Sequence, residues 1–115
     1  MHEVSLVRNI FNSLNAEFSQ EEVKTIKTIK LTVGVLSNVE PLLMQNAFEA
    51  VVATDHPEFK LARLDIIKLD IVVHCKHCQT NSEVFNYSFI CKDCKLPTND
   101  IIQGNELLIN GVEFL

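Results

Sequence analysis

Four cysteines occur late in the chain as two closely spaced pairs, Cys75 with Cys78 in "CKHC" and Cys91 with Cys94 in "CKDC". A Cys-x-x-Cys turn brings two thiolates together, and two such turns supply the four ligands of a closed tetrahedral zinc site. The intervening residues 79–90 are long enough for a small hairpin, although generic zinc sites use about 15 to 20 residues there. The pattern predicts structural zinc and leaves no open position for a reacting water.

Two alternative interpretations of the cysteines are structural disulfides and a redox-active pair of the thioredoxin type. The sequence has neither a secretory signal nor a βαβ pattern around either pair, which favours zinc. His74 precedes the first pair and His77 lies within it, and both are expected at the surface or beside the ligands. A segment this short cannot bury enough apolar surface to fold alone, so we expect the metal to replace the missing core.

The first residues, Met1, His2 and Glu3, could form a second metal site. Initiator methionine is normally removed only before a small residue, so we expect Met1 to remain in front of the bulky His2. The α-amine, the amide of His2 and its imidazole could then close two fused rings around one metal ion. The alternative is a solvated histidine on a frayed terminus.

Two amphipathic helices are predicted to position these residues. The first runs from His2 to about Glu17, and its apolar face contains Val4, Val7, Ile10, Phe11, Leu14 and Phe18. Packing of that face would hold the first turn near the body of the domain. For the second helix, Ser37 and Glu40 have the spacing of a capping box and Pro41 suits the first turn. This helix is expected to bury Leu43, Ala47, Phe48 and Val51.

The remaining segments predict strands and loops. A polar connection, "SQEEVK", leads to a half-buried strand over residues 29–35, where apolar and polar residues alternate. The loop "TDHPEF" contains His56, which is expected at the surface and without a function. Near the C-terminus, "IIQGNELLINGVEF" predicts two short strands about Gly104 and Asn105, the second able to pair with the first sheet.

A longer strand, "LARLDIIKLDIVVHC", changes the phase of its apolar alternation between Ile66 and Ile67. Such a change indicates a bulge, or a strand that leaves one core and enters another. We therefore expect a boundary between two modules at about residues 68–74.

Composition limits the possible functions. With 115 residues, 47% hydrophobic and 22% charged, the chain fits one small domain or two very small ones. The net charge of -5 disfavours nucleic acid and anionic membranes as partners. Without a predicted signal peptide or membrane span, the chain is expected to be cytoplasmic. It has no Gly-rich phosphate loop, H-E-x-x-H or G-x-S-x-G, so an enzyme is not expected.

Several segments together resemble the HypA/HybF family of nickel metallochaperones for [NiFe]-hydrogenase maturation. They are "MHEVSLV", "VGVLSNVEPLLMQNAFE", the late Cys-x-x-Cys pairs and "IIQGNELLI", and the resemblance extends over essentially the whole chain. It implies an α/β fold in which two helices cover a three-stranded sheet, with a zinc-ribbon-like domain inserted. The nickel-binding domain would comprise residues 1–70 and 105–115, and the zinc-binding domain residues 71–104.

The resemblance also implies ligands and partners. Nickel(II), the transported ion, would bind the Met1 amine and His2, with Glu3 nearby; zinc would bind Cys75, Cys78, Cys91 and Cys94. Partners would be the GTPase of the maturation pathway and the hydrogenase large-subunit precursor, with a possible homodimer. Many family members have glycine after each cysteine pair, where this chain has Gln79 and Lys95.

Ligand chemistry is consistent with this assignment of two metals. Nickel(II) with nitrogen donors favours square-planar geometry, whereas four thiolates suit zinc. Glu3 and Glu40 could add an oxygen ligand, although Glu40 is more simply a solvated carboxylate at the start of the second helix. The main alternative function is a zinc-ribbon module that binds nucleic acid or a transcription partner. Lys76, Lys92 and Lys95 support that alternative, and the acidic balance opposes it.

Overall fold

The computed structural model describes residues 2–115, and Met1 lies outside the described residues. The helices are α1 (Glu3–Glu17), α2 (Gln20–Val23) and α3 (Pro41–Thr54), with 3-10 turns η1 (Val35–Ser37) and η2 (Pro57–Phe59). The strands are β1 (Ile26–Gly34), β2 (Arg63–Leu69), β3 (Val72–His74), β4 (Asn81–Glu83), β5 (Ile101–Gln103) and β6 (Leu107–Phe114). They form two three-stranded sheets, β2-β1-β6 and β4-β3-β5. No helix within residues 2–115 is both long and apolar enough to span a bilayer.

The chain divides into two compact units. Unit 1 comprises the residues up to Leu31, Val39–Ile67 and Leu108–Leu115, and unit 2 comprises Thr32–Asn38 and Lys68–Leu107. The sequence did not predict that residues 32–38 belong with the zinc-binding part. The predicted domain limits, residues 1–70 with 105–115 and residues 71–104, remain a prediction.

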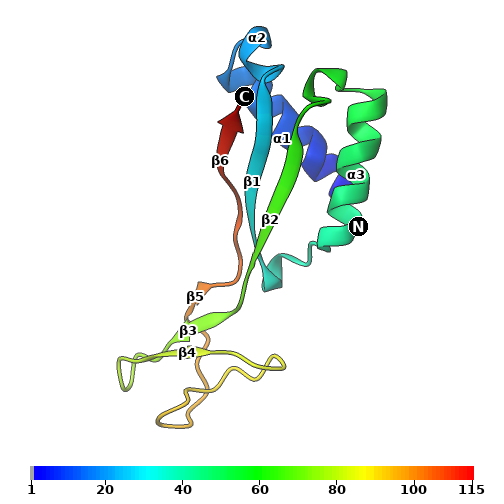
Figure 1. Ribbon diagram of the computed structural model, residues 1–115. Helices are drawn as coiled ribbons and strands as arrows, with labels where there is room; N and C mark the ends of the chain where they lie inside the picture. The colour runs from blue at the N-terminus through cyan, green and yellow to red at the C-terminus, as the bar shows by residue number, and fades with distance from the viewer. Residues whose placement is uncertain (1) are drawn as a thin grey trace. The chain divides into compact units, whose positions relative to one another are not determined.

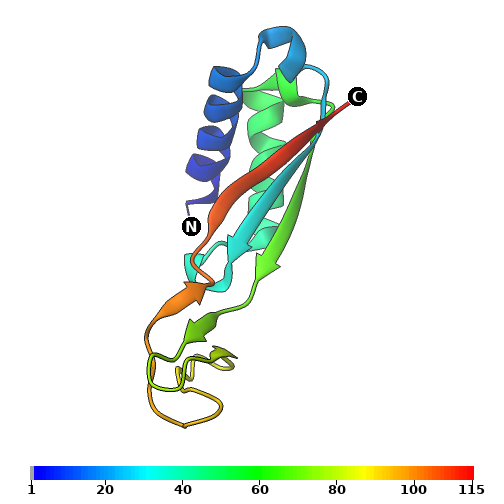
Figure 2. The same cartoon turned by 90° about the vertical axis from the view of Figure 1, so that its left-hand side faces the viewer.

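In unit 1, α1 and α3 lie side by side over one face of the first sheet (Figure 1), as the turned view also shows (Figure 2). Phe11 of α1 is fully buried. Its ring lies 4.3 Å from that of Phe59 and 5.3 Å from that of Phe48. This aromatic cluster holds α1 against α3, and burial of such a ring contributes about 2 to 3 kcal/mol.

The first predicted helix is confirmed, because α1 spans Glu3–Glu17. The capping box predicted for the second helix is wrong. The N-cap of α3 is Glu40, and Ser37 instead donates to the Gly34 carbonyl over 2.7 Å, which completes the turn η1. Pro41 does begin the helix, as predicted. The predicted burial of Leu43 is wrong: it is 48% exposed, because the buried face of α3 has helical spacing from Met44, which is fully buried, through Ala47, Phe48 and Val51.

Two segments that the sequence predicts as connections, residues 19–24 and the loop that contains His56, are more ordered than expected. Residues 19–24 contain the short helix α2, with a capping box in which Ser19 and Glu22 bond each other's backbone N–H groups. The prediction of a surface His56 is wrong, because its ring is half-buried, with its centroid 5.2 Å from that of Phe11. This proximity to Phe11 accounts for its partial burial.

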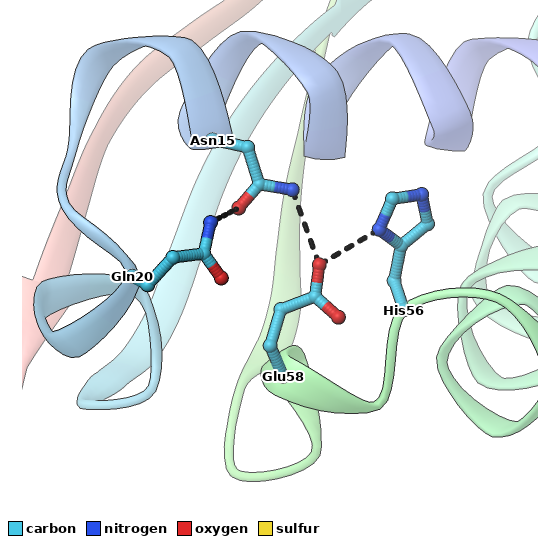
Figure 3. Close-up of polar contacts among 4 residues, drawn as sticks. All are labelled: Asn15, Gln20, His56 and Glu58. Atoms are coloured by element: carbon cyan, nitrogen blue, oxygen red, sulfur yellow. Dashed lines mark hydrogen bonds and ion pairs between the residues drawn. The ribbon is translucent and has the colours of Figure 1, made fainter.

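His56 also belongs to a polar network that Figure 3 shows. Its Nδ1 lies 2.9 Å from a Glu58 oxygen, and Asn15 donates to the same oxygen over 3.1 Å. Burial raises the pKa of the Glu58 carboxyl, but hydrogen bonds from His56, its own backbone and Asn15 outweigh this and lower that pKa overall. The bonds tie the loop after α3 to α1. Because the folded-state pKa is depressed, their stabilising contribution is present at neutral pH and lost as the pH falls through that pKa.

The predicted change of core along the long strand is confirmed. β2 belongs to the first sheet and β3 to the second, with the break at Asp70 and Ile71. Ile71 and Val73 are buried in unit 2, where they form a small apolar cluster with Val84. The predicted return of the last strand to the first sheet is also confirmed, since β6 is part of it.

A close backbone approach holds residues 32–38 in unit 2. The N–H of Leu36 donates to the Gly104 carbonyl over 2.7 Å. A Cβ atom on Gly34 would lie 2.1 Å from the Gly104 carbonyl carbon, so only glycine fits there. Gly104 itself has φ 121, a backbone conformation that L side chains rarely adopt.

Candidate metal centres

The four cysteines converge on one point in unit 2. Their Sγ atoms all lie within 4.8 Å of one another. The Cys78–Cys91 and Cys75–Cys94 sulfurs are 3.3 and 3.6 Å apart. Zn–S bonds of about 2.3 Å in a tetrahedron place sulfurs about 3.8 Å apart, so the set fits zinc after small shifts of the sulfurs.

Both cysteine turns have the same backbone geometry, even though neither contains glycine. The N–H of Gln79 donates to the Cys75 carbonyl over 2.8 Å, and that of Lys95 to the Cys91 carbonyl over 3.0 Å. Gln79 and Lys95 adopt left-handed conformations, with φ 61 and 64. Each side chain then bonds a carbonyl three residues earlier. Both turns therefore form the left-handed conformation that favours glycine without having glycine there.

This geometry predicts the effect of substitutions at Gln79. A left-handed conformation costs an L residue roughly 1–2 kcal/mol, and a β-branched side chain more. We expect Gln79→Val to weaken zinc retention in a chelator competition assay and Gln79→Gly to preserve it. Equal retention in the two variants would show that the turn places no demand on this residue.

The backbone and the neighbouring thiols divide the charge unequally among the sulfurs. Backbone N–H groups of Cys94 and then Asp93 lower the pKa of Cys91 to about 5, so Cys91 is a thiolate at neutral pH. The Leu96 N–H acts to lower the pKa of Cys94, but burial and the other thiols raise it to about 12. The sulfurs thus oppose one another's ionisation, and a divalent cation would relieve that repulsion.

Polar groups next to the sulfurs support the site. The Thr80 hydroxyl lies 3.1 Å from the Cys78 sulfur. The Lys92 N–H donates to the Ser82 hydroxyl over 3.1 Å, which links the second turn to β4. His74 lies beside the site, with Nδ1 2.8 Å from the Asn81 side-chain oxygen. Sequence reasoning missed Thr80 and Ser82, since a hydroxyl near a cysteine pair has no distinctive spacing.

The N-terminal candidate residues lie at the start of α1 in unit 1. His2 is exposed at the N-cap, where its carbonyl accepts from the Leu6 N–H over 2.9 Å and its side chain caps nothing. Glu3 is only 6% exposed in the first turn, and its carboxylate interacts with the backbone of Glu40. The starts of α1 and α3 are therefore adjacent. The predicted nickel ligand Met1 lies outside the described residues.

Comparisons with known proteins agree with this arrangement. Residues 1–114 match the model of the family described as "Hydrogenase/urease nickel incorporation, metallochaperone, hypA". A hydrogenase maturation factor HypA of Desulfitobacterium hafniense is 34% identical, and the match covers 98% of this chain and 97% of that one. The guanidine hydrolase-activating protein A of Synechocystis is also 34% identical, with coverage of 98% and 94%.

Solved structures resemble this fold over its full length. The solution structure of the nickel metallochaperone HypA from Helicobacter pylori is 25% identical, with a TM-score of 0.66, and the match covers 100% of this chain and 98% of that one. A second HypA solution structure is 26% identical, with a TM-score of 0.71 and coverage of 100% and 97%. The sequence match over residues 1–114, together with this fold, shows that the chain belongs to the HypA family of nickel metallochaperones.

Proposed function

We propose that this chain carries Ni(II) on its N-terminus to a nickel enzyme precursor, as a cytoplasmic binding protein without catalytic activity. The nickel ligands would be the Met1 amine and His2, with Glu3 beside them, and Cys75, Cys78, Cys91 and Cys94 would hold structural zinc. The observation that carries the proposal is that His2 is exposed, whereas Glu3, the next residue and the first of α1, is buried. The His2 side chain is therefore accessible to a partner, while the helix that follows it is held in place by packing.

The helix start also suits coordination by a deprotonated amide. The first N–H groups of a helix have no partner within that helix. His2 is the N-cap of α1, so its amide proton can be displaced by nickel without breaking a helical hydrogen bond. The first helical hydrogen bond, from the Leu6 N–H, uses the carbonyl of His2 and not its amide nitrogen, so nickel binding at that nitrogen leaves the bond intact.

Charge at this end of α1 would otherwise oppose a cation. A helix N-terminus carries about half a positive charge. The carboxylate of Glu3 lies in the first turn and offsets that charge. Glu3 therefore supports nickel binding electrostatically, whether or not one of its oxygens is a ligand.

The client is proposed from the relatives. A [NiFe]-hydrogenase large-subunit precursor, reached together with the GTPase of that pathway, is the first candidate, because several relatives are named hydrogenase maturation factors. Guanidine hydrolase is the second candidate, because a relative with the same sequence identity to this chain, 34%, is named as its activating protein. A homodimer remains a further prediction.

The function is tested by nickel transfer. Protein with an authentic N-terminus is loaded with radioactive nickel and mixed with each purified apo client, and the client is then isolated and counted. We expect the parent to transfer nickel and His2→Ala to transfer none, because the substitution removes the imidazole donor and leaves only the α-amine and the backbone amide of residue 2. His77→Ala is the matched control, since His77 is also exposed but lies between two cysteines. Equal transfer by parent and His2→Ala would refute the proposed site.

A further inference from the structure

Strand β4 forms an open edge of the second sheet. The sheet order is β4-β3-β5, so among residues 2–115 β4 has a neighbouring strand on one side only. The Val84 N–H donates to the Ile71 carbonyl, and the Cys75 N–H donates to the Thr80 carbonyl. In an antiparallel pair, every second residue of a strand bonds the neighbouring strand, so Thr80, Ser82 and Val84 direct their backbone groups toward β3. The backbone N–H and carbonyl groups of the alternate residues, Asn81 and Glu83, therefore point away from β3.

A groove of about 800 Å³ lies along this strand. All three residues of β4 line it. Phe85 and Ile90, which are 69% and 44% exposed, add apolar surface. Lone exposed apolar residues need no explanation, but here they stand beside unpaired strand edge groups. This combination is typical of sites that accept an extended peptide as an added strand.

Charge indicates which peptide would fit. Lys92 and Lys95 line the groove with only one acidic residue, Glu83, in a chain whose net charge is -5. Lys95 already bonds the Lys92 carbonyl, which holds its ammonium group beside the groove. The groove thus presents two cationic side chains and one carboxylate beside the Cys91 sulfur, and the two ammonium groups are complementary to carboxylates.

We infer that β4 and its groove bind an extended segment of a partner protein in which acidic residues alternate with small apolar ones. The segment would pair with the outward backbone groups of Asn81 and Glu83. Its carboxylates would face Lys92 and Lys95, and its apolar side chains would contact Phe85 and Ile90. Because this surface lies on the zinc-binding unit, the inference does not depend on the nickel site.

The inference is tested with the full, zinc-loaded chain and a short fluorescent peptide of alternating glutamate and valine. We expect saturable binding by fluorescence anisotropy, and much weaker binding of the matched lysine and valine peptide. The double variant K92E/K95E should weaken the acidic peptide by at least about tenfold, because like charges then oppose it. The double variant K68E/K76E makes the same change in net charge outside the groove and should bind normally.

Strand pairing is separated from simple charge attraction by two N-methylated forms of the peptide. Only alternate residues of an added strand face β4, so methylation of one set of N–H groups should abolish binding and methylation of the other should not. Amide resonances of Asn81 and Glu83 should shift on binding. Equal binding of both methylated forms, no binding of the acidic peptide, or stronger binding of a short oligothymidylate would each overturn the inference, the last in favour of a nucleic-acid surface.

Discussion

Cys91→Ala is expected to lose zinc and to disorder much of unit 2, from about His74 to Lys95, while α1 and the first sheet remain folded. Structural zinc contributes about 10 to 16 kcal/mol in small metal-dependent modules. Unit 2 has a small apolar core, chiefly the buried cluster of Ile71, Val73 and Val84, and such a core cannot replace the metal. Metal analysis of the purified variant and loss of amide dispersion from unit 2 would show the effect.

The control for this experiment is His77→Ala, which changes an exposed residue between two cysteines. It should keep a full equivalent of zinc and the parental spectrum. If Cys91→Ala also kept a full equivalent, the four-thiolate assignment would be wrong. If unit 1 melted together with unit 2, the two units would have to be regarded as one cooperative structure.

The parts of this fold that the sequence predicts are those fixed by local pattern. Two Cys-x-x-Cys pairs can close a tetrahedral site in few ways, and the four sulfurs do lie together. The face of α1 follows from helical spacing because one side packs on the sheet. The strand that changes sheets was visible because alternation has a strict period of two, so a change of core must shift its phase.

The features that the sequence missed depend on contacts between distant segments. The N-cap of α3 is Glu40 because Ser37 bonds Gly34 in a preceding turn, and a spacing pattern cannot choose between two such local structures. The burial of His56 depends on Phe11, which is far away in sequence. The placement of residues 32–38 with unit 2 depends on the approach of Gly34 to Gly104, which a lone glycine does not reveal.

Adding a few residues before Met1 is expected to abolish specific nickel binding while leaving zinc unchanged. The extension keeps every side chain but converts the α-amine into an amide, and this removes the donor that anchors the first chelate ring. Loss of a direct ligand should cost more than the roughly 10- to 100-fold that loss of a supporting group costs. Calorimetric titration and the visible absorption of square-planar nickel would measure the loss.

The extension distinguishes an amine-anchored chelate from a site built on the His2 imidazole alone. His2→Ala removes the ring in either case, so that variant cannot separate them. In the extended protein the imidazole remains exposed at the N-cap of α1, and Glu3 remains in the first turn. A protease site placed so that cleavage regenerates Met1 provides the matched control, because the cleaved protein should regain the parental affinity and spectrum. An extended protein that binds nickel as the parent does would leave the imidazole and Glu3 as the donors and rule out the terminal amine.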